Sequence, residues 1–372
     1  MQYIWQNPSW PNFNYDLKTL APLLAEIRLL QGRLLGHTDH LDLDASLSSQ
    51  IDTLVQEALE TSAIEGESLN VSSVRSSAAR RLGIMSVGVD TSTDATDQLV
   101  QMLLDAVSNV TQPLSQTLLC DWQNSLFTER PIFLPENAII GGLRIDEPGH
   151  PMAVVSRKGR REIVHFVAPP SEVLEAELEQ FIAWFNNPPV ELDGIVRAGI
   201  AHLWLVTLHP FSDGNGRLAR AVMDRALAQD ENTSVRFYSM SAAIMRSRNE
   251  YYDALETAQK SGLDITEWLS WFLETLKEAM LRSLMQFQMT LRKAKFLRMF
   301  SEEMLNERQS KVLNRMLDAA PDEFSEGINA SKYKSIASTS KPTATRDLSD
   351  LVARGLLKQL PGGGRSTRYV LS

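Results

Sequence analysis

The sequence predicts a mainly α-helical protein, in which a helical core with a β-hairpin flap lies between a helical N-terminal extension and a small C-terminal domain. Apolar residues recur at the three-to-four-residue spacing of amphipathic helices along most of the chain. Strand patterns occur in two places, at residues 152–167 and in the last fifteen residues. A glycine-rich loop at residues 209–216 separates two helical patterns and is the most informative segment.

Length and composition indicate a globular protein with more than one domain. The chain has 372 residues, 43% hydrophobic and 22% charged, and a single core rarely grows beyond about 250–300 residues. One cysteine, Cys120, excludes a disulfide framework, and six scattered histidines disfavour a metal cage built from protein ligands alone. No signal-peptide pattern and no membrane-spanning apolar stretch is visible, so we expect a cytoplasmic protein.

Helical periodicity predicts a succession of amphipathic helices before and after the loop. The helix that precedes the loop should end near Leu208, because Pro210 disfavours α-helical geometry in the residue before it. His209 would therefore stand at the exit of that helix. The expected helical ranges are 16–35, 47–65, 95–107, 115–128, 170–185, 195–208, 217–230, 245–258 and a long one from 266 towards 307.

The loop and the start of the next helix combine residue types that suit the phosphates of a nucleotide. Gly214, Asn215 and Gly216 allow a tight turn whose backbone N–H groups can converge on an anion, and the following helix adds the positive end of its dipole. Arg217 and Arg220 lie three residues apart on one face of that helix. The segment therefore predicts a phosphate-binding site beside a histidine.

The twelve residues from His209 to Arg220, HPFSDGNGRLAR, resemble the signature of the Fic family, HPFx(D/E)GNGRxxR, at every specified position. Most proteins of this family are AMP transferases, which move AMP from ATP to a hydroxyl side chain of a target protein and release pyrophosphate. The resemblance implies the Fic fold for a catalytic core at residues 113–300. It also implies ATP as the substrate and Mg²⁺ as the cofactor of a protein adenylyltransferase.

The resemblance gives each residue of the segment a role. His209 is the expected general base, which takes the proton of the attacking Ser, Thr or Tyr hydroxyl; an unperturbed histidine pKa of about 6.5 suits this task at neutral pH. Asp213 is the expected ligand of the Mg²⁺ that bridges the α- and β-phosphates. The phosphates are assigned to Gly214, Asn215, Gly216, Arg217 and Arg220, with the two arginines at the outer ones.

Three residues in or near the segment also have a purely structural interpretation. Arg220 and Asp224 are spaced for a surface ion pair along one helix, which would explain Arg220 without a ligand. Phe211 is expected to anchor the loop in the core. His202, on the preceding helix, is expected to be a structural histidine.

A second pattern predicts that the enzyme is autoinhibited. Fic proteins of one class carry an inhibitory helix that ends in (S/T)xxxE(G/N), and residues 61–66, TSAIEG, resemble this motif at the end of an amphipathic helix. Gly66 stands where a C-terminal cap belongs. Glu65 would pair with Arg220, so that ATP binds with its α-phosphate turned away from in-line attack. Family members with this glutamate can also remove AMP from a modified target, so the reverse reaction is open.

Residues 152–156 and 163–167 resemble the β-hairpin flap on which Fic proteins bind the main chain of their target as an added strand. The turn between them, residues 157–161, is basic, which indicates either a solvated tip or a preference for acidic targets. The residues expected to meet the target are Val154, Val155 and Ser156.

The helical pattern after the loop resembles the part of many Fic proteins that forms the adenine pocket. Tyr252 and Asn249 are the candidates for contacts with the base. Arg144, in a G-x-R segment before the hairpin, is expected to be scaffold.

The N-terminal extension, residues 1–112, resembles that of bacterial Fic proteins and is expected to pack the inhibitory helix onto the core. Its aromatic residues are Trp5, Trp10 and Phe13.

The C-terminal end differs from the rest of the chain in charge. Between residues 331 and 372, eight Lys or Arg stand against two Asp, a net charge of +6, and the remaining residues therefore carry −15 within the total of −9. Residues 301–372 resemble a winged helix-turn-helix domain. Its recognition helix would contain residues 343–348, with Arg346 meeting a base edge or a phosphate, and its wing would contain residues 364–366.

Two functions are left open by the sequence. The first is an autoinhibited AMP transferase that acts on a protein target or on itself. The second is a DNA-binding transcriptional regulator whose Fic core is a sensor, which salt-sensitive binding to duplex DNA would favour. The complete motif favours the enzyme, because a relic need not keep its base, its carboxylate and both arginines. A protein partner for the C-terminal domain and a homodimer also remain open.

Overall fold

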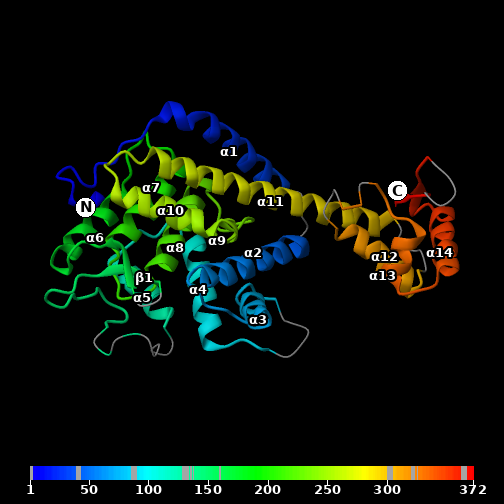
Figure 1. Cartoon of the computed structure of the whole chain (residues 1–372), viewed down its shortest axis with the longest axis horizontal. Coiled ribbons are helices and arrows are strands. Elements are labelled where there is room, and N and C mark those ends of the chain that lie inside the picture. The colour runs from blue at the N-terminus through cyan, green and yellow to red at the C-terminus, as the bar shows by residue number, and fades with distance from the viewer. Residues whose placement is uncertain are drawn as a thin grey trace. The chain divides into compact units, whose positions relative to one another are not determined.

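The computed structural model of the chain confirms a mainly helical architecture (Figure 1). It describes residues 3–38, 43–84, 90–127, 134, 136, 138–158, 161–299, 305–319, 323–324, 326–361 and 367–372. The chain divides into two compact units, residues 1–283 and 284–372. In the described residues no helix is long and apolar enough to cross a bilayer.

The first unit contains a short 3₁₀ helix, a run of α-helices and one β-hairpin. Their order is η1 (Ile4–Gln6), α1 (Leu17–Thr38), α2 (Leu43–Ile64), α3 (Val71–Arg81), α4 (Asp94–Ser108), α5 (Gln116–Ser125), β1 (Ala153–Lys158), β2 (Arg161–Val167), η2 (Ser171–Val173), α6 (Leu174–Asn186), α7 (Gly194–Leu208), α8 (Asn215–Glu231), α9 (Met240–Arg246), α10 (Arg248–Lys260) and α11 (Thr266–Met299), which continues into the second unit.

Helices α7 and α8 form the centre of the first unit (Figure 1). Every residue of α7 after Gly194 is buried, as expected for a helix that is apolar all round. Gly199 lets α11 approach, because a Cβ there would lie 2.8 Å from the ring of Phe272. The two helices pack against each other along their length, so that the loop which joins them has a rigid support on both sides.

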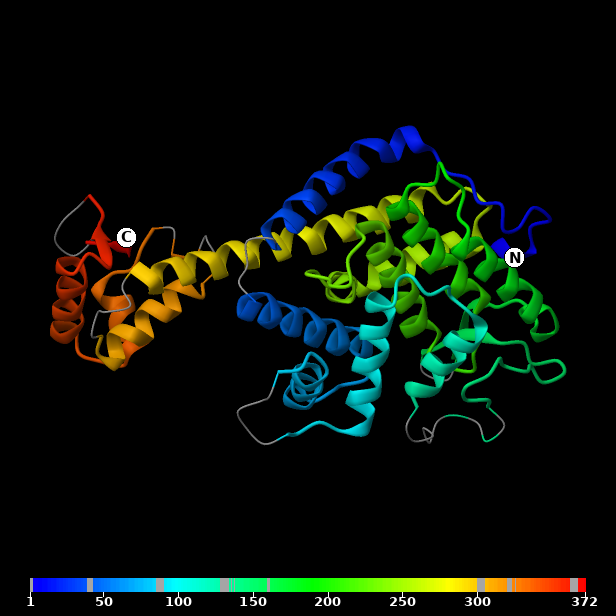
Figure 2. The ribbon, with the colours of Figure 1, turned by 180° about the vertical axis from the view of Figure 1, so that it is seen from behind.

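Helix α2, which carries the expected inhibitory motif, packs with α3 and α4 against α8 and α9, and Figure 2 shows these helices side by side. Asn70 caps the N-terminus of α3 and Thr93 that of α4, each through its side-chain oxygen. Glu57 of α2 is buried and accepts hydrogen bonds from Ser239 and Ser241 at the start of α9. These contacts fix α2 on the core.

Within the N-terminal extension, α3 and α4 are the elements that pack on α2, and α4 also packs on α8. The aromatic residues at the start of the extension contact the core instead: Trp10 and Phe13 lie edge-on to Trp204 of α7, with ring centroids 6.1 and 5.7 Å away. Both views show α1 along the first part of α11, where Glu26 pairs with Lys277 (Figures 1 and 2).

The second unit consists of α12 (Glu307–Leu317), α13 (Ala330–Ala337), α14 (Lys341–Ala353) and the antiparallel strands β3 (Leu357–Gln359) and β4 (Tyr369–Leu371). It has its own core, to which α14 contributes three fully buried residues, Ala344, Leu348 and Leu351. An isolated bridge joins Ile328 to Tyr369. The assignment as a winged helix stays a prediction, and its expected wing, residues 364–366, lies outside the described residues.

Two expected helices have other boundaries in the structure, and a third helix was not expected. The range 245–258 is divided at Ser247 into α9 and α10. The long helix ends at Met299, and Glu307 begins a new helix that Asn306 caps. Helix α3 was not expected, because its many Ser and Arg residues give it a weak apolar stripe although Val74 and Ala78 are fully buried. Tertiary burial, which periodicity does not report, explains it.

Candidate active site

The glycine-rich loop connects α7 to α8 and turns sharply at His209. This residue ends α7 with φ of +50° and ψ of +54°, in the left-handed region that non-glycine residues rarely adopt. Arg144 fixes the turn: its Nε donates to the His209 carbonyl at 2.7 Å, and its backbone N–H donates to the Pro210 carbonyl at 3.0 Å. Since Arg144 is buried and also binds Asp146, it acts as scaffold for the loop.

The hydrogen-bond partner of the His209 imidazole defines its tautomer. Its Nδ1 lies 3.2 Å from the carbonyl oxygen of Val206, which can only accept, so Nδ1 carries the hydrogen. The Nε2 atom therefore keeps its lone pair. Burial lowers the pKa of His209 to about 4, with a smaller opposing contribution from the Val206 contact. The ring is thus neutral at neutral pH, as a general base must be.

Inside the loop, Asn215 ties the two ends together. Its Oδ1 accepts from the backbone N–H of Phe211 at 3.0 Å, and its Nδ2 donates to the Phe211 carbonyl at 2.8 Å. Phe211 is fully buried, as expected for an anchor. The amide of Asn215 therefore maintains the loop, and the phosphate-binding role predicted for this residue depends on its backbone N–H.

Helix α8 begins with free backbone donors. Gly214 is its N-cap, with φ of +85°, and provides no side-chain cap. The first N–H groups of a helix lack intrahelical partners, and the helix dipole adds positive charge there. Both effects favour an anion directly after the histidine.

Asp213 stands at the edge of this anion site. One carboxylate oxygen, Oδ1, accepts from the backbone N–H of Gly214 at 2.6 Å, and no described residue binds the other oxygen. In the described part of the chain no cluster of three metal-binding side chains occurs. A single carboxylate beside a phosphate site nevertheless fits Mg²⁺, which takes most of its ligands from phosphates and water.

Both arginines of the motif are paired with carboxylates from the end of α2. Arg220, which is 1% exposed, donates through Nη2 to Glu65 Oε1 at 2.7 Å and through Nε to Thr61 Oγ1 at 2.8 Å. Burial disfavours the charge on Arg220, but Glu65 raises the pKa of the guanidinium above its ordinary value. Arg217 donates to Glu67 Oε2 at 2.8 Å.

The surface ion pair between Arg220 and Asp224, considered from their spacing, is therefore wrong. Both side chains are buried, and Asp224 pairs with Arg236 of the segment between α8 and α9. The expected structural role of His202 agrees with its environment: it is 1% exposed, stacks on Trp268 and lies 3.0 Å from the Tyr251 hydroxyl.

The turn that ends α2 explains how two carboxylates reach the two arginines. Gly66 has φ of +86°, its N–H donates to Ala63 O, and the N–H of Glu67 donates to Ser62 O. This pair of bonds is the Schellman motif, which reverses the chain at a helix end. Glu65 precedes the reversal and Glu67 follows it, so both side chains return to α8.

Glu65 also occupies space at the start of α8. A Cβ built on Gly216 would lie 2.2 Å from Glu65 Oε1. The carboxylate thus lies against the backbone at the start of α8, beside Arg220. Glu65 therefore occupies the place where the sequence predicts the outer phosphates.

Sequence reasoning did not identify Glu67 or Arg248 as parts of this site. Arg248 Nε donates to the Ile64 carbonyl at 2.8 Å, and the Tyr252 hydroxyl lies 3.2 Å from the same oxygen. A cation at the C-terminus of a helix is stabilised by the helix dipole. The signal for Glu67 was present in the sequence, because a Schellman turn at Gly66 makes the residue after it return towards the helix.

The candidates for adenine contacts lie on α10 near the end of α2. Tyr252 is 36% exposed and Asn249 is exposed. Their contact with a base stays a prediction.

The expected flap is an antiparallel hairpin of β1 and β2, with a register shift between Val154 and Val155. Both of these valines are partly exposed, at 36% and 42%. Ser156 Oγ lies 2.7 Å from His165 Nε2, and His165 Nδ1 lies 2.7 Å from Glu256 of α10, which connects the hairpin to the core. Residues 159–160 of the basic turn lie outside the described residues.

A helical core with a histidine-glycine loop, two arginines and a hairpin beside them defines the class of Fic-fold proteins. Residues 113–227 match the Fic/DOC family, and residues 3–84 match a domain of unknown function, DUF4172. The chain therefore contains a Fic/DOC domain at residues 113–227. It shares its fold with a Fic family protein from Desulfovibrio desulfuricans G20, at a TM-score of 0.50 and 17% identity over 95% of each chain.

Two curated relatives match more locally. The protein adenylyltransferase fic-1 of Caenorhabditis briggsae is 36% identical over 95 residues, which are 25% of this chain and 17% of that protein. The protein adenylyltransferase Fic of Aedes aegypti is 24% identical over 273 residues, 68% of this chain and 50% of that protein. The chain thus matches half or less of the length of these relatives.

Proposed function

We propose that this protein is an adenylyltransferase that moves AMP from ATP to a Ser, Thr or Tyr hydroxyl of a protein, and that Glu65 inhibits it at rest. The observation that carries the proposal is the neutral His209 with its free Nε2, next to the donors that begin α8. The two relatives named adenylyltransferases support the same reaction.

The reaction needs one proton transfer and one substitution at phosphorus. The hydroxyl oxygen of the target attacks the α-phosphorus while its proton moves to Nε2 of His209. The bond from the α-phosphorus to the bridging oxygen breaks, and pyrophosphate leaves with that electron pair. The N–H groups of Gly214, Asn215 and Gly216 and the guanidinium of Arg217 would bind the phosphates during this step.

Mg²⁺ fits the same site with Asp213 as its protein ligand. When bound, the ion would neutralise phosphate charge. Asp213→Asn should therefore weaken the dependence of activity on added Mg²⁺. The free carboxylate oxygen at the edge of the loop supports this assignment.

Inhibition follows from competition for Arg220. While Glu65 pairs with Arg220 and lies against Gly216, an outer phosphate of ATP loses both its cation and its space. ATP would then bind with its α-phosphate out of line with the incoming hydroxyl. The glutamate could also position water for the reverse reaction, the removal of AMP from a modified protein.

The flap would present the target. The partly exposed strand residues Val154, Val155 and Ser156 form a short open strand to which an extended peptide can add. This position supports a protein substrate, either a separate target or a second copy of the chain.

Labelled ATP tests the proposal directly. The wild type, Glu65→Gly and His209→Ala are incubated with ATP labelled at the α-phosphate, with Mg²⁺, and with or without cell lysate. We expect label on protein to rise roughly tenfold or more in Glu65→Gly, since a charge-assisted bond to a buried arginine is removed, and to be absent in His209→Ala. Equal labelling in wild type and Glu65→Gly would contradict autoinhibition, and labelling without His209 would contradict the catalytic role.

DNA binding by the second unit is the other candidate function. The observation that favours it is the exposure of Lys341, Thr345 and Arg346 on α14 within the basic part of the chain. It does not compete with the enzyme, because the two activities would lie in different units.

A further inference from the structure

A line of three side chains connects the β-hairpin to α10. Ser156 Oγ of β1 lies 2.7 Å from His165 Nε2 of β2, and His165 Nδ1 lies 2.7 Å from Glu256 Oε2 of α10. Hydroxyl, imidazole and carboxylate in this order are the arrangement of a nucleophile, its base and the group that orients the base. None of the three residues is in the phosphate loop or on α8.

A β-bulge brings the serine and the histidine together. Val154 pairs with Phe166 and Val155 pairs with Val164, so the ladder skips His165. The residue that a bulge leaves unpaired can turn its side chain away from the regular alternation, and bulges recur beside active sites. The ring of His165 can therefore contact Ser156 within the hairpin and Glu256 outside it.

The carboxylate fixes the tautomer of His165. Because an ionised carboxylate can only accept, Nδ1 carries the hydrogen and donates it to Glu256, and Nε2 accepts from the Ser156 hydroxyl. Burial raises the pKa of Glu256, but hydrogen bonds from Lys260 and His165 outweigh this effect and hold the pKa below its ordinary value. Glu256 is therefore ionised at neutral pH, as the group that orients the base must be.

The three side chains are open to a reagent from solvent. Ser156 is exposed, and the side chains of His165 and Glu256 are 35% and 36% exposed. Ile163 is paired directly opposite Ser156, and Val154 precedes Ser156 by two residues on the same face of β1. Both are partly exposed, at 41% and 36%, so apolar surface flanks the hydroxyl.

We propose that Ser156 is the nucleophile of a second site, which hydrolyses esters of small apolar carboxylic acids. Ser156 Oγ forms a bond to the carbonyl carbon of the ester while its proton moves to His165 Nε2. The bond from that carbon to the alcohol oxygen then breaks, and the alcohol leaves with the proton from His165. Water attacks the acyl-serine by the same proton path, which releases the carboxylic acid and restores Ser156.

The open edge of β1 offers the donors for the oxygen that becomes negative during attack. Among the described strands β1 pairs only with β2, so alternate backbone N–H groups along it point away from the hairpin and are unpaired. Solvent reaches such an edge and weakens its hydrogen bonds, in contrast to a buried oxyanion hole. We therefore expect slow turnover in which the acyl-serine accumulates.

The reaction is measured with the full chain and without ATP. p-Nitrophenyl butyrate should release a burst of about one equivalent of p-nitrophenolate per chain, followed by slow turnover. The butyrate should react faster than the acetate, because its longer chain contacts Val154 and Ile163. The absence of a burst would overturn the proposal, and equal rates for the two esters would contradict the apolar preference.

An alkyl fluorophosphonate locates the nucleophile. The Ser156 oxygen forms a bond to phosphorus, fluoride leaves with the electron pair of the P–F bond, and the proton moves to His165. Peptide mass spectrometry should find the label on Ser156. Ser156→Ala should abolish labelling, and Ser349→Ala, at an exposed position of α14, should leave it unchanged. A label that persists in Ser156→Ala would overturn the assignment.

Substitutions of the two partners separate activation from mere exposure. His165→Ala should slow the labelling of Ser156 by roughly a hundredfold, the lower end of what a positioned base contributes. Glu256→Gln keeps an acceptor for Nδ1 but loses the charge, so it should lower the labelling rate at saturating reagent and leave the half-saturating concentration unchanged. Labelling as fast as in the wild type in both variants would show an exposed serine that is not activated.

His209→Ala distinguishes this site from the proposed AMP transferase. Its burst and its labelling of Ser156 should equal those of the wild type, because the reaction uses neither ATP nor the phosphate loop. Loss of the burst in a folded His209→Ala would overturn the separate site. If no variant transfers AMP while Ser156 is still labelled, the proposed transferase is refuted and the second site is not.

Discussion

His209 shows how one residue acquires its chemistry from backbone geometry. The left-handed conformation at the end of α7 brings its Nδ1 to Val206 O and leaves the lone pair of Nε2 available for the proposed role as general base. The same burial that orients the ring also lowers its pKa to about 4. With this pKa, nearly all of the imidazole is unprotonated near neutral pH and is therefore able to accept a proton from a hydroxyl group.

The pH dependence of catalysis should reflect this shift. The rate constant of Glu65→Gly at saturating ATP should not decline through protonation of His209 between pH 8 and pH 6, because the imidazole stays neutral above its lowered pKa. Loss of Glu65 removes a negative charge that raises this pKa, so the acid limb should move to still lower pH. An acid limb centred near the ordinary histidine value of about 6.5 would contradict a buried, neutral base.

Glu67 should contribute to inhibition less than Glu65 does. The side chain of Glu67 is 41% exposed and pairs with Arg217. The side chain of Glu65 is 30% exposed and pairs with the fully buried Arg220. Pairs exposed to solvent contribute about 0.2–1 kcal/mol, so Glu67→Gln should raise AMP transfer by at most roughly fivefold. Labelling with α-labelled ATP measures the effect. Glu60→Gln, on α2 but outside the two pairs, is the control. An increase for Glu67→Gln equal to that for Glu65→Gly would show that the two carboxylates act as one unit.

In the proposed inhibition, α2 is the element that would turn the ion pair between Glu65 and Arg220 into a regulated state. It is anchored at Glu57 by the serines of α9 and at its C-terminus by Arg220, Arg248 and Tyr252. Many of these contacts are made by charged or polar groups around the last turns, where the carbonyl groups need partners. On release of α2, water would take the place of these donors.

Helix α14 is the element that decides between DNA and protein as the partner of the second unit. If it enters a DNA groove, Arg346→Gln should weaken binding of the full chain to duplex DNA and lower the slope of log affinity against log salt by about one. Lys311→Gln removes the same charge from an exposed position of α12 and should change the affinity less. Fluorescence anisotropy at several salt concentrations measures both, and salt-independent or undetectable binding would favour a protein partner.

The whole molecule combines two units that each have a separate core. The first unit contains the loop, the two carboxylates and the hairpin, and the second is built around residues such as Leu348 and Leu351. The expected domains, residues 1–112, 113–300 and 301–372, stay predictions. The structure divides the chain into compact units between residues 283 and 284. Catalysis should therefore need only the first unit to be folded.

A core substitution in the second unit tests this independence. Leu348→Ala removes a fully buried side chain and should destabilise that unit by about 2–5 kcal/mol, while AMP transfer by the Glu65→Gly background should stay unchanged. Differential scanning calorimetry resolves the affected transition, and Ser349→Ala, exposed on the same helix, is the control. A parallel loss of stability and of catalytic rate would mean that the two cores unfold as one.

The sequence alone was sufficient for the mainly helical class, for the loop between α7 and α8 and for the end of α2 at Gly66. Each depends on local constraints: helical periodicity, the residue before Pro210, and the positive φ that glycine permits. The twelve-residue motif also pointed to the Fic family, because so many fixed residue types in one segment leave few other interpretations.

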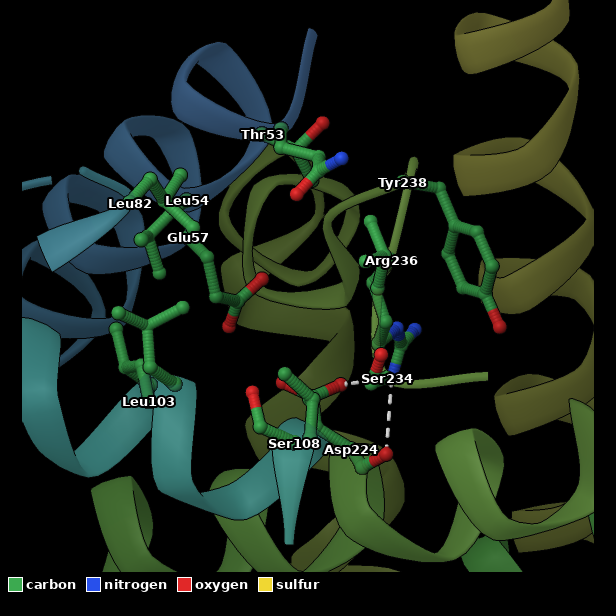
Figure 3. A pocket seen from close by; sticks show the side chains of 14 residues that line it. Thr53, Leu54, Glu57, Leu82, Leu103, Ser108, Asp224, Ser234, Arg236 and Tyr238 are labelled. Carbon is green, nitrogen blue, oxygen red and sulfur yellow. Dashed lines mark hydrogen bonds and ion pairs between the residues drawn. The ribbon is translucent and has the colours of Figure 1, made fainter. Parts of the chain in front are cut away.

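Only the tertiary structure decided which charges meet. Arg220 could have paired with Asp224 by spacing, but burial brings Glu65 to it and gives Asp224 to Arg236. Helix α3, the role of Glu67 and the pocket that α2 and α4 form beside Arg236 (Figure 3) likewise depend on segments far apart in the chain. Local sequence fixes the conformation of a turn or a helix, whereas the partner of a buried charge depends on the packing of the whole unit, since an unpaired charge in the interior is too costly to keep.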